Sequence, residues 1–199
     1  HMFAYIFWNE DSCLFSFTGT HFESEWHDDA QFQLTKPCKL NGYHPGVKVH
    51  EGFYQIYLSI RSQLWAWWRN YGHNMKWVYV SGHSLGGALC TLCAYDFADI
   101  CGPAQMVNYS FASPRVGNVT FAKTFNKRVP HGLRIYNTED IVVSLPPSAI
   151  KKKGVKYIYE HVGFGIPFTM SLCTLSEDHC EAYQFGMPQC VPQRTLCKV

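Results

Sequence analysis

The sequence lacks any long hydrophobic run, any strong excess of one charge and any repeated or low-complexity segment. No apolar stretch approaches the ~18 residues that a membrane-spanning helix requires, so we expect no transmembrane segment. Seventeen Lys and Arg residues against fifteen Asp and Glu residues leave a net charge of +2, which gives no indication of a nucleic-acid partner. A zinc site is not expected either, because Cys90 and Cys93 have no second CxxC pair to complete it.

Apolar residues, by contrast, are plentiful. Hydrophobic residues make up 47% of the chain and charged residues 16%, a balance typical of globular proteins. A length of 199 residues predicts one domain over residues 1–199, large enough to bury a sizeable core. His1 and Met2 resemble the remnant of an expression tag, so the lack of a visible leader peptide carries no information about the natural protein.

Nine cysteines are present, and their positions suggest two different roles. Cys90 and Cys93 fall in a predicted helix, where small thiols are often buried core residues. Four others crowd the last 27 residues, where disulfides could staple a short, loop-rich tail: Cys173, Cys180, Cys190 and Cys197. Disulfides of this kind are typical of secreted proteins, so we expect secretion, with a cytoplasmic location as the alternative.

Strand-like and helix-like segments alternate through the middle of the chain. Strands are predicted over residues 3–7 and 13–17 (as a hairpin), 77–80, 106–111, 133–136 and 155–159. Helices are predicted over residues 52–71, 85–100 and 118–126. The first of these helices has an apolar face that includes Tyr71 and leaves out Trp65. The alternation predicts an α/β protein with βαβ units and a mostly parallel central sheet flanked by helices.

The segment Gly82-His83-Ser84-Leu85-Gly86 matches the G-x-S-x-G pattern of a nucleophile elbow. The pentapeptide alone is a weak signal, but here it lies where a predicted strand passes into a predicted helix, as an elbow requires. Gly82 and Gly86 would remove collisions with the neighbouring strand and helix, and Ser84 would project its hydroxyl above the sheet. We therefore expect Ser84 to be a nucleophile rather than part of an inert glycine-rich turn.

A serine hydroxyl needs a base, and the base needs an orienting carboxylate. In this type of fold the carboxylate and then the histidine follow the serine along the chain. Asp140 is the best carboxylate, because it follows a predicted strand and so lies at the carboxyl end of the sheet. Two histidines come after it, His161 and His179, and chain order alone leaves both as candidates.

Further blocks of sequence extend the pattern well beyond the elbow. They are Phe17-Thr18-Gly19-Thr20, His50-Glu51-Gly52-Phe53, the segment from Ser81 to Ala88, the segment from Ser113 to Asn118, and the segment from Asn137 to Val142 with Leu145-Pro146-Pro147. In this order they resemble the blocks of fungal-type class 3 triacylglycerol lipases, a family that includes phospholipases and feruloyl esterases. The resemblance covers about residues 3–185 and implies an α/β-hydrolase fold.

The resemblance also implies roles for particular residues. Ser84 would be the nucleophile and Asp140 the carboxylate. The segment from Asp178 to Tyr183 is similar to the family's D-H-x-x-x-Y context, which favours His179 as the base over His161. The backbone N–H groups of Thr20 and Leu85 would form the oxyanion hole. Residues 21–33, where the family's lipases carry a lid, are short and polar here, which favours a more open, esterase-like site.

These features lead to one main functional hypothesis and two alternatives. The main hypothesis is hydrolysis of carboxylic esters, above all acylglycerols, through an acyl-enzyme and without a metal or other cofactor. A phospholipase of the A type is the first alternative, and a non-catalytic, lipase-like binding protein is the second. The expected partners are a lipid or small ester substrate and, transiently, a lipid interface. The run Lys151-Lys152-Lys153 is either a solvated loop or a site of attraction to anionic lipid.

Overall fold

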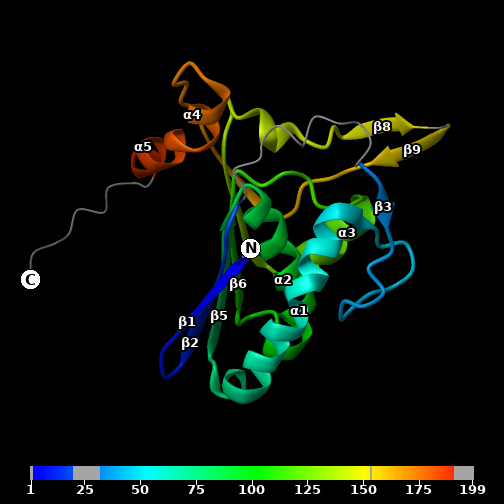
Figure 1. The fold of residues 1–199 in the computed structure, drawn as a ribbon, viewed down its shortest axis with the longest axis vertical. Coiled ribbons are helices and arrows are strands. Elements are labelled where there is room, and N and C mark those ends of the chain that lie inside the picture. The colour runs from blue at the N-terminus through cyan, green and yellow to red at the C-terminus, as the bar shows by residue number, and fades with distance from the viewer. Residues whose placement is uncertain (1, 20–31, 153, 191–199) are drawn as a thin grey trace, which may run out of the picture.

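A six-stranded sheet forms the centre of the molecule in the computed structural model, which describes residues 2–19, 32–152 and 154–190. Its strands, in spatial order, are β1 (Ala4–Trp8), β2 (Ser12–Phe17), β5 (Trp77–His83), β6 (Met106–Phe111), β7 (His131–Asn137) and β10 (Phe164–Phe168). Only β1 runs antiparallel to its neighbour, and every other pair is parallel (Figure 1). The mostly parallel α/β sheet expected from the sequence is thereby confirmed.

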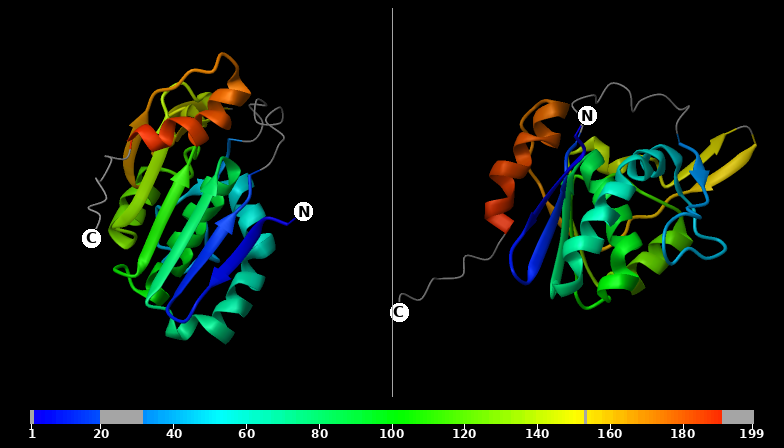
Figure 2. Two further views of the ribbon diagram at one scale, coloured as in Figure 1. Left: turned by 90° about the vertical axis from the view of Figure 1, so that its left-hand side faces the viewer. Right: turned by 60° about the horizontal axis from the view of Figure 1, so that its bottom comes forward.

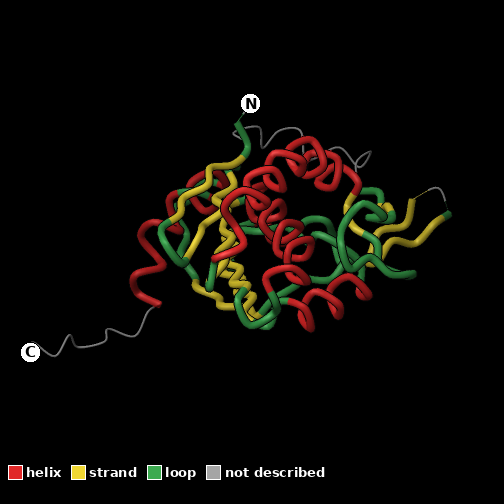
Figure 3. Tube along the Cα trace, turned by 90° about the horizontal axis from the view of Figure 1, so that it is seen from below, coloured by secondary structure: helices red, strands yellow, loops and turns green. Residues whose placement is uncertain are grey.

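Helices cover both faces of this sheet. One face carries α1 (Glu51–Tyr71), α2 (Leu85–Cys101) and α3 (Val119–Arg128), and the other carries α4 (Leu175–His179) and α5 (Glu181–Cys190). Figure 2 shows α4 and α5 lying across one end of the sheet face that α1, α2 and α3 leave open, and Figure 3 shows the strands between the two sets of helices. The paired helices α4 and α5 therefore lie near the end of the sheet where the parallel strands finish.

The main core lies between the sheet and α1, with α2 in the middle. Nearly every residue of α2 is buried, which explains why its sequence is apolar on all sides and rich in small residues. From the sheet, Phe15 and Val80 face this helix as register partners on neighbouring strands, and both are fully buried. A smaller cluster joins Ile135 and Phe168 of the sheet to Tyr183 of α5. The two clusters hold the sheet from opposite sides.

Helix α1 begins and ends almost where the sequence predicts. His50 is its N-cap, since its Nδ1 accepts a hydrogen bond from the Phe53 N–H at 3.3 Å, and Gly72 is its C-cap. Two side chains differ from the prediction. Tyr71 was expected in the buried face but is 51% exposed. Trp65 was expected outside that face but stacks on Phe97, with ring centroids 4.6 Å apart, because its indole N–H reaches a buried acceptor on α2.

Two short hairpins lie outside the central sheet. They consist of β3 (Leu34–Thr35) with β4 (Val49–His50) and of β8 (Ala149–Lys152) with β9 (Val155–Ile158). The predicted strand over residues 155–159 therefore exists, but it pairs in a separate hairpin. The sixth strand of the sheet is instead β10, which the sequence analysis did not predict. One-turn 3-10 helices, η2 (Gly72–Asn74) and η3 (Ile141–Ser144), follow α1 and β7.

The carboxy-terminal part of the described chain is helical, not loop-rich as the sequence analysis expected. Helices α4 and α5 account for most of residues 175–190. No disulfide joins two cysteines within the described residues, and Cys173 is an exposed thiol. The side chain of Cys190 and all of Cys197 lie outside those residues. Disulfide stapling therefore finds no support, and secretion stays a prediction. No described helix has the length and hydrophobicity to cross a membrane.

Candidate active site

The turn between β5 and α2 holds Ser84 in a strained backbone conformation. Ser84 has φ 59° and ψ −123°, a region that non-glycine residues rarely occupy and that is found most often at functional sites. Hydrogen bonds fix the turn on both sides: the Ser84 N–H donates to the Phe111 carbonyl at 3.0 Å, and the Gly87 N–H donates to the Ser84 carbonyl at 2.9 Å. The structure therefore imposes on Ser84 the geometry of an elbow.

Glycines surround this turn because there is no room for a side chain. A Cβ atom at Gly82 would collide with the backbone of Gly86, and one at Gly86 would collide with the backbone carbonyl of Phe17. Gly19 lies against the same turn, since a Cβ atom there would be 3.1 Å from the His83 carbonyl oxygen and 3.6 Å from the Ser84 Cβ. The strand end of β2 and the elbow are consequently in close contact.

Asp140 lies in the loop that follows β7, at the carboxyl end of the sheet, and its side chain is buried. It is the N-cap of η3, because its Oδ1 accepts a hydrogen bond from the Val142 N–H at 2.9 Å. Its Oδ2 accepts two more, from Nδ1 of His179 and from the hydroxyl of Tyr183, each at 2.8 Å. Three donors thus hold the carboxylate in one orientation and stabilise its charge.

His179 is the last residue of α4 and is 2% exposed. Because its Nδ1 faces the Asp140 carboxylate, the proton resides on Nδ1 and Nε2 is left as the basic nitrogen. His83, the residue before Ser84, donates from Nε2 to the His179 carbonyl oxygen at 2.7 Å, and the two rings lie 4.7 Å apart. Burial lowers the pKa of His83 to about 4, so its ring is neutral near pH 7. The imidazole of His179 therefore stands beside the elbow.

His161, the other candidate base, has a different environment. Its Nε2 donates to the Val143 carbonyl at 2.9 Å, which uses the nitrogen that a general base would need. Burial, together with the nearby guanidinium groups of Arg134 and Arg115, lowers its pKa to about 3. The structure thus pairs Asp140 with His179 and fixes His161 to the backbone.

A second layer of polar contacts supports this pair. The Asn137 N–H donates to the Tyr183 hydroxyl at 3.0 Å, and the Asn137 side chain donates to the carbonyls of Met170 and Asp178. Burial and the adjacent Asp140 charge raise the pKa of Tyr183, so its hydroxyl remains a donor. The sequence analysis gave no role to Asn137, Tyr183 or His83, although all three belong to the blocks that carry the resemblance.

The predicted oxyanion hole lies partly outside the described residues. Leu85 is the first residue of α2 and is buried, so its N–H belongs to the positive end of the helix next to Ser84. Thr20 and residues 21–33, where the family's lipases carry a lid, fall almost entirely in the part that the structure does not describe. Within the described residues, no group of three or more His, Cys, Asp and Glu side chains is arranged to hold a metal ion.

A mostly parallel sheet, a strained serine elbow after one of its strands and a buried carboxylate–imidazole pair from later loops define an α/β-hydrolase-fold protein. Residues 14–150 match the model of the lipase (class 3) family. The chain belongs to this family.

Individual relatives agree with this assignment. A chloroplastic phospholipase A(1) of Arabidopsis thaliana is 33% identical over an alignment of 155 residues, which covers 70% of this chain and 35% of the relative. A secreted mono- and diacylglycerol lipase of Malassezia globosa is 33% identical over 131 residues, 64% of this chain and 43% of the relative. The structure of a Rhizomucor miehei lipase–propeptide complex superposes with a TM-score of 0.66 at 28% identity, covering 81% of this chain and 49% of that one. This chain therefore spans between a third and a half of these three proteins.

Proposed function

We propose that the protein hydrolyses carboxylic esters of lipids through an acyl-enzyme formed on Ser84. The observation that carries this proposal is the buried Asp140–His179 pair, held beside a serine whose backbone is strained into an elbow. Family membership supports the reaction class, because an elbow serine with these two partners is the arrangement that activates a hydroxyl for attack on an ester.

In the proposed mechanism, His179 Nε2 takes the Ser84 proton as Oγ attacks the ester carbonyl carbon. Asp140 keeps the other imidazole proton on Nδ1 and stabilises the imidazolium that forms. The N–H of Leu85, and that of Thr20 as the sequence predicts, donate to the negatively charged oxygen. His179 then passes its proton to the departing alcohol. Water, deprotonated by the same nitrogen, attacks the acyl-enzyme and releases the acid, which restores Ser84.

Acylglycerols are the leading substrate proposal, supported by the mono- and diacylglycerol lipase among the relatives. A phospholipase A activity is the second candidate, favoured by the phospholipase A(1) relative. Hydrolysis of emulsified triglyceride, monoglyceride and phosphatidylcholine under identical conditions separates the two. Preference for phosphatidylcholine over both glycerides would reverse their order.

Replacing Ser84 tests the reaction itself. Ser84→Ala is expected to lower the release of p-nitrophenol from short and medium acyl esters by ~10⁴-fold or more, because no other group supplies the nucleophile. Ser59→Ala, an exposed serine whose hydroxyl donates to the Ile56 carbonyl, is the matched control and should retain full activity.

A fluorophosphonate probe gives an independent reading, since it should label the wild type and leave Ser84→Ala unlabelled. Equal turnover by Ser84→Ala and the wild type would contradict the mechanism. No turnover and no labelling of the wild type would leave the non-catalytic binding function as the explanation of the fold.

A further inference from the structure

The hairpin of β8 and β9 is rich in positive charge. Residues 151–156 include four lysines, and no Asp or Glu occurs between Asp140 and Glu160. In Figures 1 and 2 the hairpin projects from the body of the molecule as a separate arm. It therefore presents a basic strip that belongs neither to the central sheet nor to the core.

The pairing within this hairpin is electrostatically unfavourable. Lys151 of β8 stands directly opposite Lys156 of β9, and both side chains are exposed. Like charges at opposite positions of an antiparallel pair destabilise it, whereas an opposite charge at either position would stabilise it. Within the described residues neither lysine forms an ion pair. The hairpin thus has a repulsion that a negatively charged partner would relieve.

The hairpin is also joined directly to the candidate active site. Asp140 leads into η3, and η3 leads within a few residues into β8. On the return path, His161 follows β9 and donates back to the Val143 carbonyl of η3. Figure 1 shows the hairpin and α4, which carries His179, at the same end of the molecule, whereas Figures 2 and 3 show them on opposite sides of the sheet. A lipid surface lying across this end would therefore contact the hairpin and face the catalytic groups.

Exposed apolar side chains accompany the lysines at this end of the molecule. Ile141, next to Asp140, is 43% exposed, Leu175 at the start of α4 is 57% exposed, and Val155 in the hairpin is 51% exposed. Apolar residues beside a lysine cluster are the combination that binds lipid head groups and the outer acyl region together. A nucleic-acid partner would not require these apolar side chains, so lipid is the better match.

We propose that the β8–β9 hairpin docks the protein on an anionic lipid surface and so brings the active site to the bilayer. The inference rests on the proposed lipid hydrolysis and names the surface on which it takes place. Attraction is electrostatic and acts through Lys151, Lys156 and their neighbours, with Ile141, Val155 and Leu175 meeting the interface. It should weaken as salt rises, because ions screen exposed charges beyond about 8–10 Å at physiological ionic strength.

Vesicle sedimentation tests the proposal with the full chain carrying Ser84→Ala, so that no lipid is consumed. Phosphatidylcholine vesicles are compared with vesicles containing 30 mol% phosphatidylglycerol, roughly the composition of an anionic membrane. The hairpin variant carries Lys151→Gln and Lys156→Gln. The matched control carries Lys123→Gln and Lys127→Gln, which change two exposed lysines of α3 and the net charge by the same amount.

Preferential binding to the anionic vesicles, lost by about 30-fold in the hairpin variant but not in the control, supports the proposal. Equal loss in both double variants would show a general charge effect and overturn it, as would unchanged binding by the hairpin variant. Binding of an oligonucleotide or an acidic peptide as tight as that of vesicles would assign the hairpin to another partner.

Hydrolysis of soluble p-nitrophenyl butyrate by the hairpin variant with Ser84 intact should equal that of the wild type. If the wild type does not hydrolyse this ester, the hydrolase function is refuted. If the wild type hydrolyses it but the hairpin variant binds anionic vesicles as well as the wild type does, only the docking is refuted.

Discussion

Tyr183 shows how a single hydroxyl can affect a reaction that it does not enter. Its oxygen accepts from the Asn137 N–H and donates to Asp140, on the same carboxylate oxygen that faces His179. The hydroxyl therefore withdraws electron density from the carboxylate and fixes its position relative to the imidazole. We regard Tyr183 as a positioning residue for the proposed triad.

Tyr183→Phe is expected to reduce kcat/KM by about 10- to 100-fold, the usual effect of losing a hydrogen bond to a charged group. With one donor fewer, the Asp140 carboxylate stabilises the imidazolium form of His179 more strongly. Since the base must be neutral, the acid limb of the pH–rate profile should move to higher pH. Steady-state kinetics across pH with a soluble ester measure both effects.

The matched control for this change is Tyr159→Phe. Tyr159 is fully buried, like the ring of Tyr183, but its hydroxyl has no hydrogen-bond partner in the described structure. Its removal should leave activity and the pH profile unchanged. A Tyr183→Phe enzyme that loses activity with an unmoved acid limb would show that the hydroxyl is only structural.

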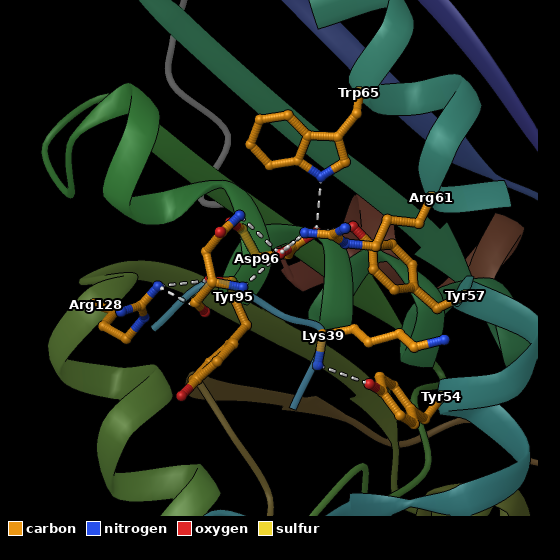
Figure 4. A network of polar contacts seen from close by, with 9 residues as sticks. Lys39, Tyr54, Tyr57, Arg61, Trp65, Tyr95, Asp96 and Arg128 are labelled. Atoms are coloured by element: carbon orange, nitrogen blue, oxygen red, sulfur yellow. Dashed lines mark hydrogen bonds and ion pairs between the residues drawn. The ribbon is translucent and has the colours of Figure 1, made fainter. Parts of the chain in front are cut away.

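At the scale of elements, a buried carboxylate joins α1, α2 and the loop before α1. Asp96 of α2 is fully buried and accepts from the guanidinium of Arg61, the hydroxyl of Tyr57 and the indole of Trp65, all on α1 (Figure 4). It also accepts from the backbone N–H of Asn41 at 2.8 Å. Because the donors from α1 and from the loop before it all converge on this one side chain of α2, Asp96 fixes the two helices against each other.

Asp96→Asn is expected to lower the free energy of unfolding by about 3 kcal/mol, since it leaves Arg61 and buried donors without their charged partner. The change should spare catalysis in the folded fraction, because Asp96 lies three turns along α2 from the elbow. Urea unfolding followed by tryptophan fluorescence measures the loss.

Asp99→Asn provides the comparison. Asp99, which like Asp96 belongs to α2, pairs with Arg128 of α3 at 2.8 Å, but the Asp99 side chain is 51% exposed. The expected loss is below ~1 kcal/mol. Equal losses for the two variants would contradict the importance given to the buried network.

At the scale of the whole molecule, one buried histidine, His50, and two partly buried ones, His83 and His161, make the folded state sensitive to acid. Burial lowers the pKa of His50 and His83 to about 4 and that of His161 to about 3. The unfolded chain takes up protons on these rings near pH 6.5, whereas the folded chain takes them up only at the lower values. Their contribution to stability is therefore complete above pH 6.5 and is lost as the pH falls towards 4 and then 3.

His161→Gln isolates one of these contributions. The glutamine amide can still donate to the Val143 carbonyl, but it does not titrate. Between pH 6.5 and 4 the free energy of unfolding should then fall less steeply, by up to about 1.4 kcal/mol per pH unit. Denaturant titrations at several pH values give the slope. His131→Gln, at an exposed position, should leave it unchanged, and an unaltered slope in His161→Gln would refute the role of burial.

The sequence predicts the middle of this fold well and its edges poorly. Strand β5 begins with an apolar run and β6 is mostly apolar, and both lie beside clear helices in the sequence, so their existence and order follow from local pattern. Strand β10 contains Gly165 and Pro167, which indicate a turn, yet an edge strand tolerates proline because no neighbour needs its N–H. Helix α4 has only five residues, too few to show a helical period.

The site divides in the same way. Ser84 and Asp140 are predictable from their positions after strands, and the preference for His179 needed the family resemblance. The contacts of His83 and Tyr183 with groups tens of residues away in sequence have no local signal. They arise only when α4 and α5 pack onto the end of the sheet. Packing over such separations is set by the whole core, which short patterns do not record.

The cap of α3 has a consequence for covalent modification. Asn118 begins the tripeptide Asn-Val-Thr, an acceptor sequence for N-linked glycans. Its Oδ1 accepts from the Phe121 N–H at 2.9 Å, while its Nδ2, the atom that would carry the sugar, donates to the Gly46 carbonyl at 2.8 Å. The only other such tripeptide begins at Asn108, which is 1% exposed within β6. In the folded protein the Asn118 nitrogen is therefore engaged in a hydrogen bond and the Asn108 nitrogen is buried, so neither is accessible for attachment of a glycan.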